Sequence, residues 1–311
     1  MTNKKITVIG PGMMGHGICL RFAMHGVTVF LYGRSQDSLD KANNRINTTL
    51  ALLNELNVVN TNRNTDILNN IELTTNLKKI VSDSDLIIES INEHLQAKQI
   101  LFDEISGLLK PESILTSNTS SLMPKLLFSK LPNKSNVAVT HYINPAVLVP
   151  LVEIVKHDET TQDTISNITD ILKSTGSQPI ILGKETPGFV TSRLQSALLR
   201  EALWLVENNI ASASDVDKAI SHGLGRRWAT AGIFEILEIA GWDLLSAIAG
   251  NLFPELSKSD TPTLLKEKVK DNEIGIKTKK GFYEWTDKSI DALRYKIAKS
   301  LVEIQNWNDS K

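Results

Sequence analysis

The chain has 311 residues, of which 41% are hydrophobic and 22% are charged, and its formal net charge is −1. This composition indicates a soluble globular protein with room for two domains, and the balanced charge argues against nucleic-acid binding. No apolar run is long enough to span a membrane, and the first residues lack the basic head and apolar core of a signal peptide, so we expect a cytoplasmic protein.

A glycine turn near the start of the chain organises the first predicted elements. An apolar strand at residues 4–9 runs into Gly10-Pro11-Gly12-Met13-Met14-Gly15, and a helix up to Gly26 and a strand at residues 27–32 follow. In such a unit the first glycine makes a tight turn, the second lets the backbone approach a pyrophosphate, and the third lets the helix pack on the strand. The helix N-terminus adds N–H groups for the anion. We therefore favour a dinucleotide site over a purely structural turn, with Gly10, Gly12, Met13, Met14 and Gly15 binding the cofactor.

The end of the second strand bears on the choice between NAD and NADP. An Asp or Glu usually stands there in NAD-binding folds and binds the adenosine ribose. Here the strand is followed by Gly33 and Arg34, and Arg34 can pair with a 2′-phosphate. This favours NADP, although an Arg34 that stacks on adenine or points to solvent is the alternative. We expect Gly33→Asp to shift the preference toward NAD.

The following elements alternate between helices and strands. Ser35 caps a helix to about residue 56, and the Asn-rich residues 54–76 are read as an exposed, mobile helix return that includes a strand at 71–74. Further strands are predicted at 85–90, 114–117, 136–140, 151–155 and 179–182, with helices at 95–109 and 161–175. This pattern predicts a doubly wound, Rossmann-type α/β domain with a parallel sheet, which binds ligands past the carboxyl ends of its strands.

From residue 185 onward the pattern is helical. Helices are predicted at 189–208, 214–222, 233–253, 263–271 and 291–307. We place the domain boundary at about residue 184, with an NAD(P)-binding domain at 1–184 and an all-α substrate and dimerisation domain at 185–311. The apolar stripes of these helices, for instance Leu198, Leu199, Ala202, Leu203 and Leu205, predict a homodimer.

The cysteine and histidine residues limit the catalytic and metal-binding chemistry that the chain can perform. The single cysteine, Cys19, excludes an internal disulfide and a cysteine metal cluster, and it reads as a small core residue; no metal site is expected. Most of the six histidines read as surface or helix residues, among them His157 as the exposed end of an element. His141 differs, because it ends an apolar strand, and Glu153 lies in a second apolar strand twelve residues later. A buried carboxylate needs a partner. A catalytic His–Glu pair and a structural bridge are equally compatible with these two residues alone.

Several separate motifs resemble the L-3-hydroxyacyl-CoA dehydrogenase family, and in particular 3-hydroxybutyryl-CoA dehydrogenases. They are residues 8–15, Ser117-Asn118-Thr119-Ser120-Ser121-Leu122, His141-Tyr142-Ile143-Asn144-Pro145, Leu151-Val152-Glu153, Thr186-Pro187-Gly188-Phe189 and Gly281-Phe282-Tyr283. The resemblance covers nearly the whole chain. It implies a Rossmann-type domain with a helical domain behind it, a dimer, and an oxidoreductase of fatty acid metabolism that passes a hydride between the substrate and the nicotinamide.

The resemblance also implies roles for individual residues. His141 would act as the general base and Glu153 would orient it, while Ser120 would bind the 3-oxygen of the substrate. The positions that correspond to cofactor contacts are Glu93, Lys98, Asn118 and Asn144, and Asn144 and Ser192 also correspond to substrate contacts.

Three departures from the family pattern leave the substrate open. The acidic ribose-binding residue is replaced by Gly33, and a family asparagine is replaced by Ser192. The stretch at 46–70, where some members bind CoA phosphates with lysines, contains Arg63 and no lysine. Instead, the segment at 223–229 resembles relatives that oxidise free 3-hydroxy acids such as carnitine and gulonate, so that Arg226 and Arg227 would bind a carboxylate. A solvated basic turn is the alternative.

The leading hypothesis is therefore an NAD(P)-dependent 3-hydroxyacyl-CoA dehydrogenase for short acyl chains. A dehydrogenase of a free 3-hydroxy acid is the second candidate. A dinucleotide-binding protein without turnover is the third, and the retained pair of His141 and Glu153 argues against it.

Overall fold

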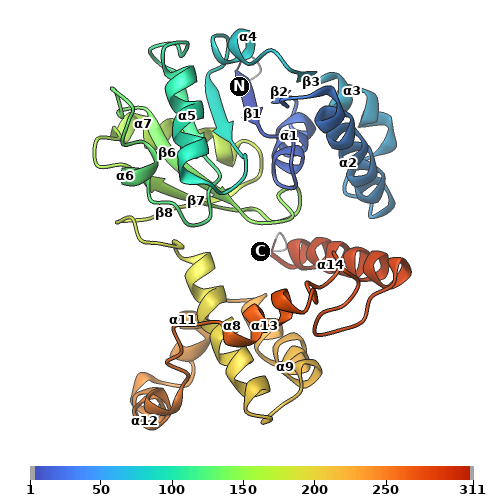
Figure 1. Ribbon diagram of the computed structural model, residues 1–311, viewed down its shortest axis with the longest axis vertical. Helices are drawn as coiled ribbons and strands as arrows, with labels where there is room; N and C mark the ends of the chain where they lie inside the picture. Colours follow the sequence, from blue (N-terminus) through green and yellow to red (C-terminus); the bar gives the residue numbers. More distant parts are fainter. Residues whose placement is uncertain (1–3, 309–311) are drawn as a thin grey trace. The chain divides into compact units, whose positions relative to one another are not determined.

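The computed structural model describes residues 4–308 of the chain (Figure 1). The chain forms two compact units that divide between Arg193 and Leu194. Our domain boundary lies earlier, at residue 184. Residues 185–193 belong to the first unit, where the backbone N–H groups of Val190 and Thr191 donate hydrogen bonds to the carboxylate of Glu153.

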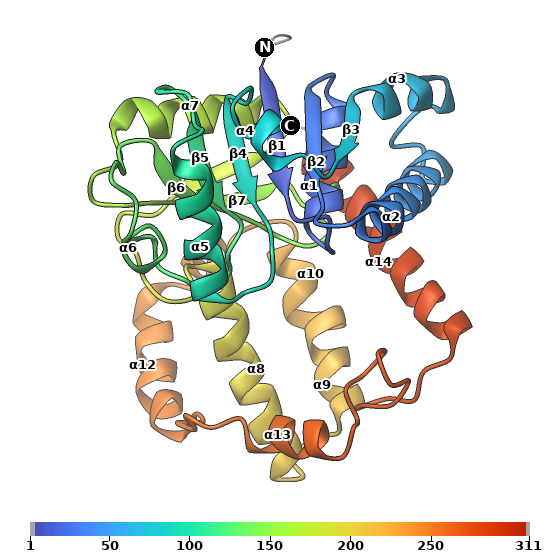
Figure 2. The same cartoon turned by 45° about the horizontal axis from the view of Figure 1, so that its top comes forward.

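An eight-stranded sheet forms the centre of the first unit, with the strand order β3-β2-β1-β4-β5-β6-β7-β8 (Figure 2). The strands are β1 Lys5–Ile9, β2 Thr28–Tyr32, β3 Ile71–Thr74, β4 Leu86–Glu89, β5 Ile114–Ser117, β6 Val137–Tyr142, β7 Leu151–Lys156 and β8 Gln178–Ile181. The order reverses at β1 and β4, so the crevice past their carboxyl ends is the expected ligand site. The doubly wound fold is thereby confirmed, with one departure from a wholly parallel sheet: β6 and β7 are antiparallel.

Helices cover both faces of this sheet. They are α1 Gly15–Met24, α2 Gln36–Glu55, α3 Asn64–Asn69, α4 Leu77–Val81, α5 Leu95–Ser106, α6 Pro124–Leu127 and α7 Gln162–Lys173. Parallel crossovers are right-handed, and β2 and β5 lie on opposite sides of the β1–β4 pair, so α1 and α5 cover opposite faces. Helices α4, α5 and α6 share one apolar cluster that includes Ile80, Phe102 and Leu127. Cover on both faces explains why the central strands are apolar along their length. Cys19 is buried in α1, as predicted.

One segment and one residue that we predicted to be exposed are partly buried and buried, respectively: the Asn-rich stretch and His157. The Asn-rich stretch forms a 3₁₀ turn at Thr61–Arg63 and then α3, and it contributes Val59 and Ile67 to the core. This packing was hard to predict from the sequence, because in this stretch Val59 and Ile67 are the two side chains that are buried. His157 is also buried, and its Nδ1 accepts a hydrogen bond from the backbone N–H of Glu159.

The second unit is helical, as predicted. Its helices are α8 Thr191–Glu207, which begins in the first unit, α9 Ala213–Ala219, α10 Gly225–Trp228, α11 Ile233–Glu238, α12 Trp242–Leu252, α13 Thr263–Lys270 and α14 Asp287–Asn308. The single helix that we predicted at 233–253 is two helices, because Gly241 adopts a positive φ of 84° between them. No helix in the described part of the chain has the length and apolar content needed to cross a membrane.

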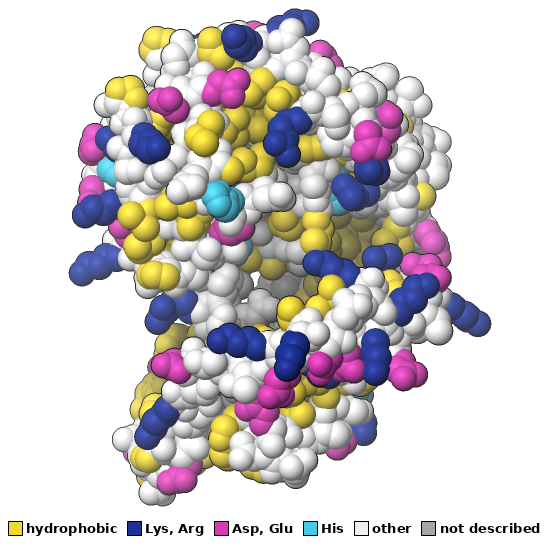
Figure 3. All heavy atoms as spheres, in the orientation of Figure 1, with side chains coloured by type: hydrophobic (Ala, Val, Ile, Leu, Met, Phe, Trp, Pro, Cys, Tyr) yellow, Lys and Arg dark blue, Asp and Glu magenta, His cyan; other side chains and the backbone are white. Residues whose placement is uncertain are grey.

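The second unit exposes much of its apolar surface. Within residues 194–307, the apolar side chains that are buried are Leu203, Ile236, Ile290 and Ala298. In contrast, Phe234 is 72% exposed and Ile239 is 88% exposed. The space-filling view shows hydrophobic side chains at the surface of the helical part (Figure 3). Apolar surface of this extent is typical of an interface.

Candidate active site

The three glycines of the first turn have three different environments. A Cβ atom on Gly10, which has a φ of 112°, would lie 2.5 Å from the carbonyl oxygen of Ser90, and a Cβ on Gly15 would lie 1.8 Å from that of Gly10. These two glycines therefore permit close backbone packing. A Cβ on Gly12 would meet nothing within 4 Å. The turn is open at Gly12, and α1 begins without a side-chain cap. This arrangement fits a dinucleotide pyrophosphate.

The end of β2 is closely packed around Gly33. A Cβ on Gly33 would lie 2.6 Å from Oγ of Ser38 and 2.8 Å from Cδ2 of Leu39, both in the first turn of α2. Gly33→Asp would therefore require the side chains of Ser38 and Leu39 to move, and its expected shift of preference toward NAD stays a prediction. Arg34 is exposed beside it.

A second arginine lies at the glycine turn. Nη1 of Arg45, on α2, donates a hydrogen bond to the carbonyl oxygen of Pro11 at 3.2 Å. Arg45 was not predicted, since an arginine on the exposed face of an amphipathic helix is usually a solvated charge.

A buried ion pair stabilises the carboxyl ends of β4 and β5. Nζ of Lys98 lies 2.6 Å from Oε1 of Glu89, and both side chains are almost fully buried. The other carboxylate oxygen of Glu89 accepts a hydrogen bond from Oγ of Ser117. Lys98 also lies 3.4 Å from Glu93. Lys98 thus holds two carboxylates in place. Sequence reasoning missed Glu89, although a carboxylate in an apolar strand is the same signal that revealed Glu153.

Glu93 organises the serine-rich turn after β5. Its Oε1 accepts hydrogen bonds from the hydroxyls of Thr119 and Ser121 and from the backbone N–H of Ser120 at 3.2 Å. Burial would raise the pKa of Glu93, but the bond from Thr119 and the charge of Lys98 hold the pKa below its ordinary value. Glu93 is therefore ionised, and Ser120 stands exposed on the turn.

The two candidate asparagines differ in their surroundings. Oδ1 of Asn118 accepts a hydrogen bond from the backbone N–H of Tyr142 at 2.8 Å, and its Nδ2 donates to Oγ of Ser90 at 3.3 Å. The Asn118 side chain thereby joins the ends of β4, β5 and β6. Asn144 is exposed, two residues after β6.

His141 and Glu153 form a hydrogen-bonded pair. Nδ1 of His141 lies 2.6 Å from Oε2 of Glu153, and both side chains are buried. The ring of His141 also contacts Phe189, with ring centroids 5.7 Å apart. Because Nδ1 faces a carboxylate, it carries the proton, and Nε2 presents its lone pair. This is the arrangement of a general base.

The second oxygen of Glu153 holds the start of α8. Oε1 accepts hydrogen bonds from the backbone N–H groups of Val190 and Thr191, each at 2.9 Å. Burial would raise the pKa of Glu153, but the bonds from His141 and from these N–H groups lower it to about 2. Next along the chain, Oγ of Ser192 donates to the carbonyl oxygen of Ser120 at 3.4 Å. Thr191 and Ser192 thus connect the His–Glu pair to the serine turn.

Arg226 and Arg227 lie in the second unit, on α10, and both are exposed. The structure brings together Ser120, His141, Glu153 and Ser192 within the first unit.

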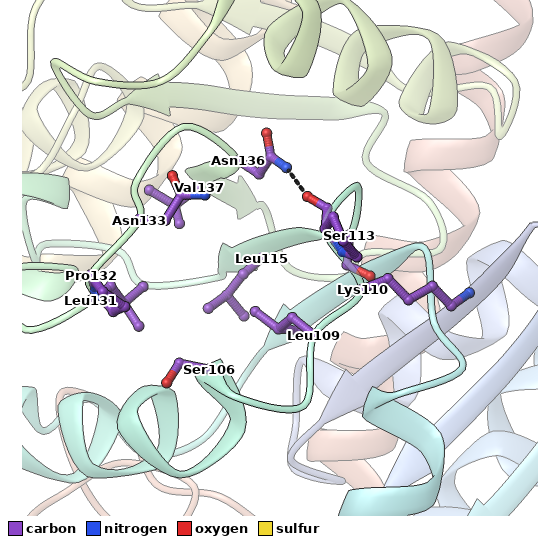
Figure 4. A pocket seen from close by; sticks show the side chains of 11 residues that line it. Ser106, Leu109, Lys110, Ser113, Leu115, Leu131, Pro132, Asn133, Asn136 and Val137 are labelled. Carbon is purple, nitrogen blue, oxygen red and sulfur yellow. Dashed lines mark hydrogen bonds between the residues drawn. The ribbon is translucent and has the colours of Figure 1, made fainter.

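A pocket elsewhere in the first unit does not belong to this site. It is lined by Leu115, Leu131 and Val137, and the close-up shows the hydrogen bond from Asn136 to the backbone near Ser113 (Figure 4). That bond joins Nδ2 of Asn136 to the carbonyl oxygen of Pro111 at 2.9 Å. The pocket lies at the amino ends of β5 and β6, whereas ligands bind at carboxyl ends.

Comparison with protein families decides the classification. Residues 5–186 match the family model "3-hydroxyacyl-CoA dehydrogenase, NAD binding domain", and residues 188–285 match the model of its C-terminal domain. The chain belongs to the 3-hydroxyacyl-CoA dehydrogenase family. Membership establishes an oxidoreductase that acts on CH–OH groups with an NAD-type cofactor.

Proteins named for different substrates resemble this chain. A crystal structure of 5-formyl-3-hydroxy-2-methylpyridine 4-carboxylic acid 5-dehydrogenase, described as an NAD⁺-dependent dismutase, is 28% identical, covers 99% of each chain and has a TM-score of 0.91. The L-carnitine dehydrogenase of Oceanobacillus iheyensis is 31% identical over 97% of each chain. The mitochondrial hydroxyacyl-coenzyme A dehydrogenase of Sus scrofa is 32% identical over 91% of each chain.

Proposed function

We propose that this family member interconverts a hydroxyl group and a carbonyl group at the 3-position of its substrate, with His141 as the general base. The observation that carries the proposal is the 2.6 Å contact between Nδ1 of His141 and the buried carboxylate of Glu153. It fixes the tautomer in which Nε2 can accept the hydroxyl proton. Glu153 remains ionised and stabilises the imidazolium that forms. Ser120, on its exposed turn, would donate a hydrogen bond to the 3-oxygen.

The residues at the carboxyl ends of the strands fit a nicotinamide dinucleotide. The open turn at Gly12 and the start of α1 would bind the pyrophosphate. Glu93 would accept hydrogen bonds from a ribose, held in position by Lys98, while Asn118 and Asn144 would line the nicotinamide side. When bound, the cofactor supplies the hydride acceptor or donor. The protein positions the reactants and excludes water.

We further propose that NADP binds at least as tightly as NAD. Support comes from the buried Gly33, which leaves no carboxylate to repel a 2′-phosphate, and from the exposed Arg34. Arg45 adds a second positive charge at the glycine turn. The NAD⁺ dependence of the similar pyridine carboxylate dehydrogenase favours the opposite preference.

For the substrate, we now favour a small free hydroxy acid over an acyl-CoA. The stretch between α2 and β3 offers Arg63 and no lysine for CoA phosphates, and Nη2 of Arg63 is bonded to the carbonyl oxygen of Met24 at 2.7 Å. The exposed Arg226 and Arg227 suit a carboxylate. The pyridine carboxylate and L-carnitine dehydrogenases match more of the chain than the hydroxyacyl-coenzyme A dehydrogenase does.

We also propose a homodimer that covers the apolar surface of the second unit. We keep the functional boundary near residue 184, with substrate binding and dimerisation assigned to the part that follows. The break between the two family models at residues 186–188 supports this division.

A substrate panel tests the proposed function. The purified protein is incubated with NAD or NADP. The compounds tested are 3-hydroxybutyrate and its CoA thioester, which form a matched pair, and in addition L-carnitine and the pyridine carboxylate named above. Reduced cofactor is measured by its absorbance. We expect turnover of a free acid and little of its thioester. Preferential turnover of the thioester would restore the acyl-CoA hypothesis, and cofactor binding without turnover of any compound would favour a non-catalytic dinucleotide-binding protein.

A further inference from the structure

Arg21 is a charged residue on α1 that lies inside the first unit. It is 6% exposed, and its neighbours along the helix, from Ile18 to Ala23, are buried as well. Its Nη1 is bonded to carbonyl oxygens, and its Nε has no hydrogen-bond partner in the described part of the chain. Burying a guanidinium without a carboxylate partner is costly. A residue retained at such a cost calls for a role beyond filling the core.

The partners of Arg21 lie in the connection between β6 and β7. Nη1 donates hydrogen bonds to the carbonyl oxygens of Ala146 at 2.8 Å and Val149 at 3.3 Å. Within this connection, the backbone N–H groups of Leu148 and Val149 both bond to the carbonyl oxygen of Pro145. The segment is therefore a closed turn, and the guanidinium of Arg21 is hydrogen-bonded to it at two carbonyl groups.

Helix α1 also packs directly against the same turn, which adds to the contact made by Arg21. A Cβ atom on Gly17 would lie 3.6 Å from Cβ of Ala146, so the helix backbone itself lies close to the turn. Tyr142, at the end of β6, is buried and its hydroxyl has no hydrogen-bond partner among the described residues. Burial lowers the pKa of Arg21, and the interaction with Tyr142 opposes that shift.

The connection held by Arg21 separates the two members of the His–Glu pair. It starts directly after β6, which carries His141, and ends where β7 begins, two residues before Glu153. It also carries the exposed Asn144. Arg21 itself lies on α1, and the first turn of this helix follows the glycine turn. Arg21 thus joins the cofactor-binding helix to the segment that presents the general base.

We propose that Arg21 is a positioning residue, which fixes the β6–β7 connection on α1 and so sets His141 and Asn144 relative to the bound dinucleotide. The proposal rests on the proposed function, since positioning matters only if His141 takes part in turnover. The guanidinium acts at a distance from the reacting atoms, through the carbonyl groups that it holds.

The experiment compares Arg21→Met with Arg63→Met. Arg63 is a matched control, because its guanidinium also donates to a carbonyl oxygen, that of Met24 on α1, but does not contact the β6–β7 connection. Three quantities are measured for the full chain: amide hydrogen exchange of Leu148 and Val149, the NAD dissociation constant, and kcat with its KM. Arg21→Lys, which keeps a donor and a charge, is measured alongside.

We expect Arg21→Met to speed exchange at both amides and to lower kcat by roughly tenfold to a hundredfold, as small misplacements of catalytic groups do. The NAD dissociation constant and KM should change little, and Arg21→Lys should recover part of kcat. Arg63→Met should behave as wild type. Unchanged exchange or unchanged kcat in Arg21→Met would overturn the proposal. If the wild type turns over no substrate, the proposed function fails, while the exchange result still decides whether Arg21 holds the turn.

Discussion

His141 and Glu153 are direct partners across the antiparallel pair of β6 and β7, and their side chains meet at 2.6 Å. Directly opposed residues in such a pair have Cβ atoms about 4.5–5.5 Å apart, which suits an imidazole bonded to a carboxylate. The reversal of strand direction at β7 is therefore what brings together two residues that are twelve positions apart. The His141–Glu153 pair is built into the sheet and does not depend on a loop.

The depressed pKa of Glu153 makes a prediction about stability and pH. Its folded-state pKa is about 2, against an ordinary value of 4.5. Because the folded value is the lower one, the ionised carboxylate stabilises the fold fully above about pH 4.5, and this stabilisation is lost as the pH falls toward 2. It is on the order of 3 kcal/mol.

Chemical denaturation at a series of pH values measures this effect. Glu153→Gln should flatten the fall in unfolding free energy between about pH 5 and pH 2. The control is Glu104→Gln, an exposed residue of α5, which should keep the wild-type slope. An unaltered slope in Glu153→Gln would show that this carboxylate does not contribute in the manner proposed.

The proposed preference for NADP predicts a selective effect of replacing Arg34. A hydrogen bond between charged partners contributes roughly 1.5–3 kcal/mol, which is about tenfold to a hundredfold in affinity. Arg34→Ala should therefore weaken NADP binding selectively, and Arg45→Ala should add to the loss. The dissociation constants of both cofactors, measured by titration, provide the check. A wild-type preference for NAD that survives Arg34→Ala would refute the NADP proposal.

The proposed carboxylate site predicts a change in KM. Replacing Arg226 or Arg227 by alanine should raise KM for a free hydroxy acid by about tenfold to a hundredfold, because a charged hydrogen bond is removed. Arg200→Ala, an exposed arginine of α8, serves as the control. Steady-state kinetics decide the matter: wild-type KM values in both variants would mean that these arginines form only a solvated turn.

The exposed apolar surface of the second unit predicts a dimer. Leu198 and Leu199 on α8 are 38% and 44% exposed. Leu198→Glu or Leu199→Glu should yield a monomer if these residues are covered by a second copy. Leu126→Glu, at a 47% exposed leucine in the first unit, should leave the assembly intact. Light scattering of the wild type on dilution is the measurement, and a monomer mass that does not change at micromolar concentration would contradict the prediction.

Local features of the sequence were sufficient to predict the fold and to single out His141 and Glu153, which form a hydrogen-bonded pair. The glycine turn was recognisable because three glycines stand at a fixed spacing between a strand and a helix: Gly10 and Gly15 permit close backbone packing, and Gly12 leaves the turn open. Glu153 was recognisable because a carboxylate in an apolar strand requires a partner. His141 was recognisable as that partner because it is a histidine at the end of a neighbouring strand.

Other features depend on contacts that the sequence does not display. Nothing local indicates that the second oxygen of Glu153 binds the start of α8, because that contact joins residues 37 and 38 positions apart. Lys98 corresponds to a cofactor contact by resemblance, but its burial beside the carboxylates of Glu89 and Glu93 could not be predicted from the sequence. Arg21 did carry a signal, a charge within an apolar helical run, whose meaning required the position of the β6–β7 connection.

The most direct test of the account is the turnover of His141→Ala beside Glu153→Gln on the best substrate of the panel. Loss of a general base lowers the rate by about two to four orders of magnitude. We expect a loss of this size in His141→Ala, with the fold and cofactor affinity retained, and a smaller loss in Glu153→Gln, which keeps the imidazole but not its charged partner. Near-native turnover of a folded His141→Ala would contradict the proposed mechanism.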